Sequence, residues 1–143
     1  MATIVVGVDG SECADKALVF AAEEAALRGA NLRVIGAWGL PVSPGHAGGT
    51  PALNPSLVSA FEALARANVD RAVAEARRLH PSLEVEGIVV MDQPAKAILD
   101  RARDTSLVVV GSRGRGGFSS LLLGSVSQQT VHHAPCPVVV IRG

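Results

Sequence analysis

Five short runs of apolar residues punctuate the chain, and most of their members are β-branched. Between the runs lie longer segments in which apolar residues recur every three or four positions. Continuous apolar runs of this length are typical of strands buried on both faces of a sheet, and the wider spacing is typical of helices with one buried face. The predicted strands are residues 4–8, 31–38, 85–91, 107–111 and 137–142.

The first two predicted helices have recognisable ends. Residues 13–28 carry a stripe of small apolar side chains and stop at Gly29, a residue that commonly ends helices. The second helix begins with Asn54 as a cap and Pro55 in its first turn, and it ends near His80. Both segments therefore read as amphipathic helices that cover a sheet.

Two further helices complete the pattern, one over residues 94–103 and one from Ser125 to just before Pro135. Because strands alternate with helices along the chain, we expect right-handed crossover connections and a parallel sheet covered on both faces. The sequence thus predicts one α/β domain over residues 1–143, built on a five-stranded parallel, doubly wound sheet.

The charge balance excludes several classes of partner. With 13 basic and 13 acidic residues and a net charge of +0, the chain has no general basic surface that would collect nucleic acid or an anionic membrane. Its two cysteines do not resemble a disulfide framework, and the N-terminal residues run directly into a strand without a signal sequence. We therefore expect a cytoplasmic protein that holds any anion by a local site.

The candidate binding motif follows the fourth predicted strand. Gly111 and Gly114 are followed by nine residues and then by the pair Gly124 and Ser125, which opens the last helix. Glycines let backbone N–H groups approach an anion closely, and the start of a helix favours negative charge. Strand, glycine-rich loop and helix in this order predict a cradle for nucleotide phosphates.

The glycine spacing also predicts how the loop folds. A straight helix from Gly114 to Gly124 would hold its ends about 15 Å apart, which is too far for both to contact one phosphate chain. The residues between them are therefore expected to fold back and bring the two glycines to one pocket. Arg113 and Arg115 would then add positive charge beside the phosphates.

A structural interpretation of the same motif stays open. The glycines would be turn residues, and Ser125 would cap its helix through the S-x-x-Q capping box that it forms with Gln128. The fixed spacing between a strand and a helix favours binding. No Walker sequence, nucleophile elbow or catalytic base accompanies the loop, so the sequence supports binding better than hydrolysis.

Asp9, at the end of the first predicted strand, has two candidate roles. If strands 4–8 and 107–111 are neighbours where the strand order reverses, Asp9 faces the glycine loop and can bind Mg²⁺ or a ribose. The alternative is that Asp9 caps the helix that follows.

Other reactive side chains have plainer interpretations. His132, His133 and Cys136 are close in sequence, but no fourth ligand for a tetrahedral metal is evident, and exposed histidines are the favoured interpretation. Cys13, in the first turn of a helix, is expected to be a small buried packing residue rather than a reactive thiol.

Together, three segments resemble the ATP-binding universal stress proteins, and the likeness covers nearly the whole chain. The segments are residues 5–11, residues 107–112 and residues 133–140, together with the spacing Gly111-x2-Gly114-x9-Gly124-Ser125. The resemblance implies a Rossmann-like fold of the adenine nucleotide alpha hydrolase type with strand order 3-2-1-4-5. It also implies ATP and Mg²⁺ as cofactors and a cytoplasmic homodimer.

The resemblance further implies roles for individual residues. Asp9 would contact the ribose or Mg²⁺, the glycines and Ser125 the phosphates, and Ala37 the adenine. The nucleotide-binding residues expected on this basis are Gly7, Val8, Asp9, Ala37, Met91, Gly111, Ser112, Arg113, Gly114, Arg115, Gly124, Ser125 and Val126. The strand expected to meet its twofold mate in the dimer consists of Pro137, Val138, Val139, Val140 and Ile141.

The chain departs from the family pattern at Asp92, where family members often have glycine. This additional carboxylate precedes helix 94–103. It would either lie near the adenine or ribose and alter base preference or affinity, or cap the helix and point to solvent.

Three functional hypotheses follow. The first is an ATP-binding stress-response regulator in which the nucleotide biases a long loop, residues 39–55, that is rich in proline and glycine. The second is a slow ATPase or a self-phosphorylating protein, with Ser112, Ser119 or Ser120 as the acceptor. The third is a structural dimer without nucleotide, which the complete glycine signature disfavours. The stress signal and the downstream protein partner are unknown.

Overall fold

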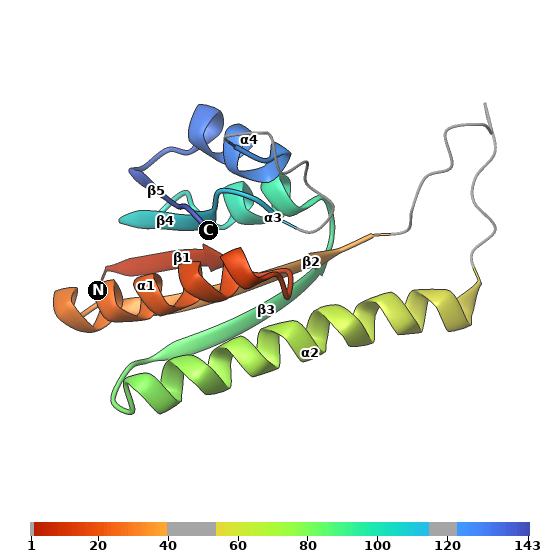
Figure 1. The fold of residues 1–143 in the computed structure, drawn as a ribbon, viewed down its shortest axis with the longest axis horizontal. Coiled ribbons are helices and arrows are strands. Elements are labelled where there is room, and N and C mark those ends of the chain that lie inside the picture. Colours follow the sequence, from red (N-terminus) through yellow and green to blue (C-terminus); the bar gives the residue numbers. More distant parts are fainter. Residues whose placement is uncertain (1, 40–53, 115–122) are drawn as a thin grey trace.

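A computed structural model describes residues 2–39, 54–114 and 123–143, and these form one parallel sheet between two helical layers (Figure 1). In chain order the elements are β1 Thr3–Gly7, α1 Glu12–Arg28, β2 Asn31–Trp38, α2 Pro55–Leu79, β3 Val85–Met91, α3 Pro94–Asp100, β4 Leu107–Gly111, α4 Ser125–His133 and β5 Val138–Ile141. All neighbouring strands are parallel, in the order β3-β2-β1-β4-β5. The predicted fold class and strand order are confirmed.

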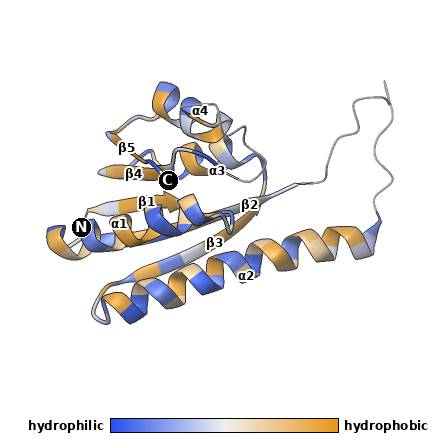
Figure 2. Cartoon of the chain, in the orientation of Figure 1, coloured by the Kyte–Doolittle hydropathy of each residue, from blue (hydrophilic) through white to orange (hydrophobic). Residues whose placement is uncertain are grey.

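The two central strands are apolar on both faces because helices cover both. Ile4, Val5 and Val6 of β1 are 0% exposed, and β4 is buried along most of its length. Ile4 and Val6 pack with α1 and α2, whereas Val5 packs with α3 on the opposite side. Alternate residues of one strand thus supply two cores, which explains the absence of polar positions in these runs. Figure 2 shows the same contrast between apolar strands and helices that are banded with polar residues.

Helix α1 packs closely on the sheet because its inward face is mostly alanine. Ala17, Ala21, Ala22 and Ala25 are all 0% exposed. The helix ends at Gly29, whose φ of 64° is left-handed, and this confirms the predicted stop. At its start the Ser11 hydroxyl accepts a hydrogen bond from Ala14 N at 3.2 Å, so the cap is Ser11.

Helix α2 has the predicted start, since the Asn54 side chain accepts a hydrogen bond from Ser56 N at 3.0 Å and Pro55 lies in the first turn. Its first buried residue is Ala65, and its beginning reaches past the ends of the strands (Figure 1). Nearer the middle of α2, Val69 packs against β3: a Cβ placed on Gly87 of this strand would come within 2.7 Å of Val69 Cγ1. The missing side chain of Gly87 therefore lets the helix approach the sheet.

The element boundaries differ from the expected ones by a few residues. Strand β1 ends at Gly7 instead of residue 8, and α3 ends at Asp100 instead of residue 103. After α3, Ala102 N and Thr105 N donate to carbonyls three residues back, so the chain continues as tight turns. Most of the predicted loop 39–55 lies outside the described residues.

The strand order reverses between β1 and β4, the neighbours at the centre of the sheet. Residue Val6 pairs with Val109, so the carboxyl ends of the two strands lie side by side. From β1 the chain moves toward β2, and from β4 it moves toward β5, which leaves a crevice between the departing loops. None of the described helices combines the length and apolar character needed to cross a membrane.

Candidate functional site

A cavity of about 410 Å³ opens at the carboxyl ends of the central strands. It lies where the strand order reverses. Its lining comes from both sides of that crevice: Gly7, Val8, Asp9, Ser11, Ala14, Ile35, Ala37, Pro94, Ile98, Val110, Gly111, Arg113, Gly114, Gly124, Ser125, Val126 and Ser127.

The cavity is apolar toward β2 and α3. Ile35 and Ala37 come from β2, two residues apart on one face, and Pro94 and Ile98 come from α3, one turn apart. Neither pair carries an ionisable group, so this part suits a flat, weakly polar ring. Ala37 lies where the adenine contact was expected.

The opposite part of the cavity is formed by the two ends of the glycine-rich loop. Gly124 N donates a hydrogen bond to Ser112 O. A Cβ placed on Gly124 would lie 3.5 Å from Arg113 Cα and 3.7 Å from Gly114 N. The predicted meeting of the two loop ends is therefore confirmed, and most of the residues between them lie outside the described residues. Arg115 lies outside the described residues.

Asp9 faces this loop from the end of β1. Its Oδ1 accepts a hydrogen bond from Ser11 N at 2.9 Å, and a Cβ on Gly114 would come within 2.7 Å of its Oδ2. The expected meeting of Asp9 with the glycine loop is confirmed. The alternative role as a helix cap is wrong, because the Ser11 hydroxyl occupies that position.

Two of the cavity's glycines make room for side chains of neighbouring helices. A Cβ on Gly111 would come within 2.8 Å of Cys13 Sγ, and one on Gly7 within 2.6 Å of Ile98 Cδ1. Cys13 belongs to α1 and Ile98 to α3, the helices that pack against the ends of β4 and β1. Gly114 is different because its near neighbour is the polar end of Asp9.

Ser112 faces into the protein and is not among the lining residues. It is 3% exposed, its N donates to Ile141 O at 2.7 Å, and its hydroxyl lies 3.7 Å from Cys13 Sγ. Cys13 is itself buried and donates to Ile141 O at 3.2 Å. The Ser112 hydroxyl is therefore a packing group, and Ser119 and Ser120 lie outside the described residues.

The predicted capping box at the start of α4 does not form. The helix begins at Ser125 as expected, but the N-cap is Gly124, which has extended backbone angles and makes no side-chain cap bond. Because its bond to Ser112 fixes Gly124 in this position, Ser125 falls in the first helical turn, where its side chain does not reach the cap geometry. Ser125 and Val126 instead line the cavity.

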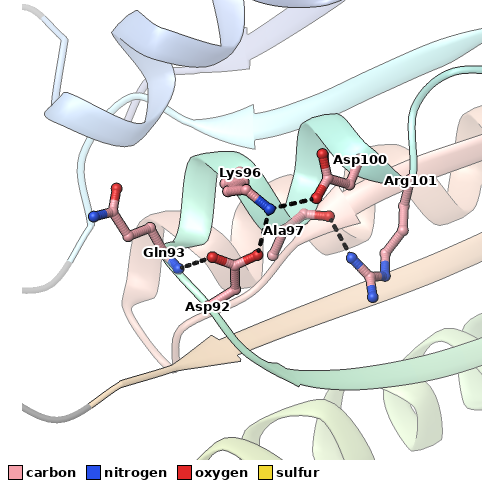
Figure 3. A network of polar contacts seen from close by, with 6 residues as sticks. All are labelled: Asp92, Gln93, Lys96, Ala97, Asp100 and Arg101. Carbon is pink, nitrogen blue, oxygen red and sulfur yellow. Dashed lines mark hydrogen bonds and ion pairs between the residues drawn. The ribbon is translucent and has the colours of Figure 1, made fainter.

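Met91 and Asp92, at the end of β3, are not brought to the cavity. Met91 is 67% exposed. Asp92 Oδ1 accepts from Gln93 N at 2.8 Å and its Oδ2 from Lys96 Nζ at 3.3 Å, which holds the carboxylate along the outer side of α3 (Figure 3). Of the two alternatives for Asp92, the surface position is the one observed, with bonds to Gln93 N and to the side chain of Lys96 in the first turn of α3.

The same surface carries the clearest pKa changes near the site. The hydrogen bonds that Lys96 donates to Asp100 and, to a smaller extent, to Asp92 raise the pKa of Lys96, and the bond from Lys96 lowers the pKa of Asp100. Lys96 and Asp100 are exposed, Asp92 is partly buried, and none of the three lines the cavity. Among the described lining residues, only Asp9 and Arg113 carry ionisable groups.

The remaining candidates lie elsewhere. His132 and His133 are exposed at the end of α4, and Cys136 Sγ lies 3.6 Å from Thr105 Oγ1. Within the described part of the chain, no three side chains of His, Cys, Asp or Glu are grouped so that they could hold a metal ion.

Seven lining residues were not anticipated, namely Ser11, Ala14, Ile35, Pro94, Ile98, Val110 and Ser127. A sequence signal existed for some of them. Ile35 shares the strand face of Ala37, and Ile98 follows Pro94 by one helical turn. Ser127 had no such signal, because its role depends on a residue fifteen positions away.

Comparisons with known proteins agree in pointing to one family. The model of the universal stress protein family matches residues 1–142. Universal stress protein Rv2005c of Mycobacterium tuberculosis is 36% identical over 141 residues, which are 99% of this chain and 45% of that protein. The chain thus spans about half the length of this relative.

Solved structures show the same likeness. The universal stress protein UspA from Lactobacillus plantarum is 28% identical, with a TM-score of 0.81 and coverage of 99% of this chain and 97% of that one. The universal stress protein from Archaeoglobus fulgidus in complex with dAMP is 29% identical, with a TM-score of 0.69 and coverage of 99% and 98%.

Proposed function

Because the chain belongs to the universal stress protein family, we propose that it binds ATP with Mg²⁺ and acts as a cytoplasmic homodimer that regulates the stress response. In this proposal residues 1–143 work as one domain. Occupancy of the site by the nucleotide, rather than turnover, carries the signal.

The observation that carries the proposal is the cavity between β1 and β4. Its apolar part, with Ala37 and Ile98, fits an adenine, and the glycine-rich part fits phosphates. The first backbone N–H groups of α4 have no side-chain cap, so they remain available to an anion at the positive end of the helix. A solved relative from Archaeoglobus fulgidus is described with dAMP, which supports an adenine nucleotide as the ligand.

Asp9 is the residue that fits Mg²⁺. This ion is commonly held by one or two carboxylates together with phosphate oxygens and water. Asp9 Oδ1 is fixed by Ser11 N, and its Oδ2 faces Gly114 across the cavity. Bound there, Mg²⁺ would offset phosphate charge, and Asp9 would orient the phosphate chain toward the glycines. Asp9 also lies within the part of the site where a ribose is expected.

The chemistry of the lining favours binding over hydrolysis. Asp9 is the single described carboxylate in the cavity, and no described histidine or lysine lines it. A positioned base is needed to activate water or a serine for attack on a phosphate. The buried position of the Ser112 hydroxyl disfavours it as a phosphate acceptor.

Calorimetric titration of nucleotide-free protein with MgATP tests the proposal. We expect a Kd in the micromolar range, about −8 kcal/mol of binding free energy. Trp38 gives an independent readout, because it is the only tryptophan of the chain and directly follows Ala37. An absence of both heat and fluorescence change at millimolar MgATP would overturn the proposal. Release of ADP above the uncatalysed rate would instead favour the enzymatic hypothesis.

A further inference from the structure

Ser127 occupies the first turn of α4 and is almost entirely enclosed, with 1% of its surface exposed. Its hydroxyl lies 3.0 Å from Ser112 O and 3.0 Å from Gly124 O. One hydroxyl proton is thus shared between a carbonyl of its own helix and a carbonyl at the start of the glycine-rich loop.

The Ser112 carbonyl is the point where the two ends of the loop are joined. It accepts hydrogen bonds from both Gly124 N and the Ser127 hydroxyl. The amide of the same residue donates to Ile141 O of β5. Ser127 therefore ties the start of α4 to a segment that is itself anchored to the sheet.

An ordinary helical role does not account for this arrangement. Serine and threonine hydroxyls in helices often donate to a carbonyl three or four residues back, and the bond to Gly124 O is of that kind. Thr130, one turn later, makes only such a bond, to Val126 O at 2.7 Å, and is 0% exposed. Ser127 differs because its second acceptor, Ser112 O, lies on another segment.

We propose that Ser127 is a positioning residue for phosphate binding, an inference that rests on the nucleotide site proposed above. By holding Ser112 against the start of α4, it fixes the N–H groups near Gly114 and those of the first turn of α4 around one point. A cradle that is already ordered binds an anion with less loss of conformational freedom. Ser127 does this through Ser112 and Gly124.

The test compares Ser127→Ala with Thr130→Val, which removes a buried hydroxyl from the same helix without touching the loop. Kd values for ATP and for adenosine are measured with each variant by calorimetry. For Ser127→Ala we expect ATP binding to weaken about fivefold or more, the factor that one lost hydrogen bond commonly represents. Adenosine, which has no phosphate, should bind Ser127→Ala and wild type alike, and Thr130→Val should bind both ligands like wild type.

Two results would overturn the role of Ser127. One is equal ATP affinity in Ser127→Ala and wild type. The other is an equal loss for ATP and adenosine, which would indicate general destabilisation. If Ser127→Ala does not fold, Ser127→Cys, which keeps the shape and only a weak donor, replaces it in the same comparison. Wild-type protein that binds neither ligand would reject the proposed function and, with it, this inference.

Discussion

Gly114 is the loop residue whose missing side chain matters most for the proposed site. A Cβ at this position would lie 2.7 Å from Asp9 Oδ2. We therefore expect Gly114→Val to displace the Asp9 carboxylate, to fill the approach to the phosphates and to weaken ATP binding at least about tenfold, or about 1.4 kcal/mol. Calorimetry with MgATP measures the effect.

Gly39→Ala is the matched control for this substitution. Gly39 follows β2, and a Cβ placed on it would meet nothing within 4 Å. This variant should bind ATP like wild type. Gly114→Val should also keep the native oligomeric mass, because Gly114 lies beyond the end of β4, whereas the proposed dimer forms through the outer edge of β5. Equal ATP affinity in both variants would show that Gly114 does not contact the phosphate path.

At the scale of elements, two serines at helix starts have different roles: Ser11 precedes α1, and Ser125 is the first residue of α4. The Ser11 hydroxyl caps α1 through Ala14 N, whereas Ser125 lies inside the first turn of α4 and makes no cap bond. Ser11→Ala should lower the free energy of unfolding by about 1 kcal/mol. Ser125→Ala should change it by less than about 0.5 kcal/mol.

Urea unfolding of the two variants measures this difference in stability, and titration with ATP measures their binding. Ser125→Ala is expected to weaken ATP binding despite its native stability, because its hydroxyl lines the cavity. A stability loss in Ser125→Ala as large as that in Ser11→Ala would indicate that Ser125 does cap α4, contrary to the structure.

The ion pairs along α3 make a prediction about pH. Asp92, Lys96 and Asp100 follow one another at intervals of four residues, and Lys96 lowers the pKa of Asp100. In Lys96→Gln the pKa of Asp100 should rise toward its ordinary value, while Arg101 and Arg103 keep part of the lowering. Carboxyl chemical shifts followed against pH by NMR measure the change.

The sign of the stability effect follows from the lowered pKa. The pair stabilises the fold above the pKa of Asp100 in the unfolded chain, and this contribution disappears as pH falls through the lowered pKa of the folded state. The effect on unfolding should be small because the side chains are exposed. Glu75, whose pKa is lowered by Arg78, is the internal control. An unchanged Asp100 pKa in Lys96→Gln would contradict the assignment.

At the scale of the whole molecule, β5 is an edge of the sheet that the proposed dimer would cover. Val138–Ile141 is half-buried along its length and pairs only with β4. The carbonyls of Pro137 and Ile141 accept from β4 and its following residue, so the alternation of a strand turns the N–H groups of Val138 and Val140 outward. A long unpaired apolar edge invites association.

Val140→Pro is therefore expected to prevent dimerisation, since it removes an outward N–H without removing a bond to β4. Val140→Ala is the matched control, because it loses similar packing but keeps the N–H, and it should stay dimeric. Light scattering after size-exclusion chromatography measures the mass. Wild-type protein that is monomeric at high concentration, or a dimeric Val140→Pro, would contradict a dimer formed through β5.

Much of this fold could be read along the chain because each element carries its own local signals. The apolar runs mark strands covered on both sides, Gly29 and Pro55 mark helix ends by their backbone conformation, and Asn54 marks one by its capping side chain. The glycine spacing also predicted that the two ends of the loop meet, because a straight helical connection would hold them too far apart. The candidate site was harder to predict. Met91 ends the edge strand β3 and is largely exposed, and the Ser112 side chain is buried against Cys13, so neither lines the cavity.

The sequence by itself determined the order and type of the elements, because periodicity and caps act over a few residues. Only the tertiary structure decided which side chain each glycine makes room for: Gly111 makes room for Cys13, while Gly114 makes room for Asp9. It likewise placed Asp92 on the surface with Lys96, made Gly124 the cap of α4 and gave Ser127 its bond to Ser112. Apart from the local Asp92–Lys96 bond, these features depend on contacts between segments far apart in the sequence, and the packing of the helices on the sheet sets which segments meet.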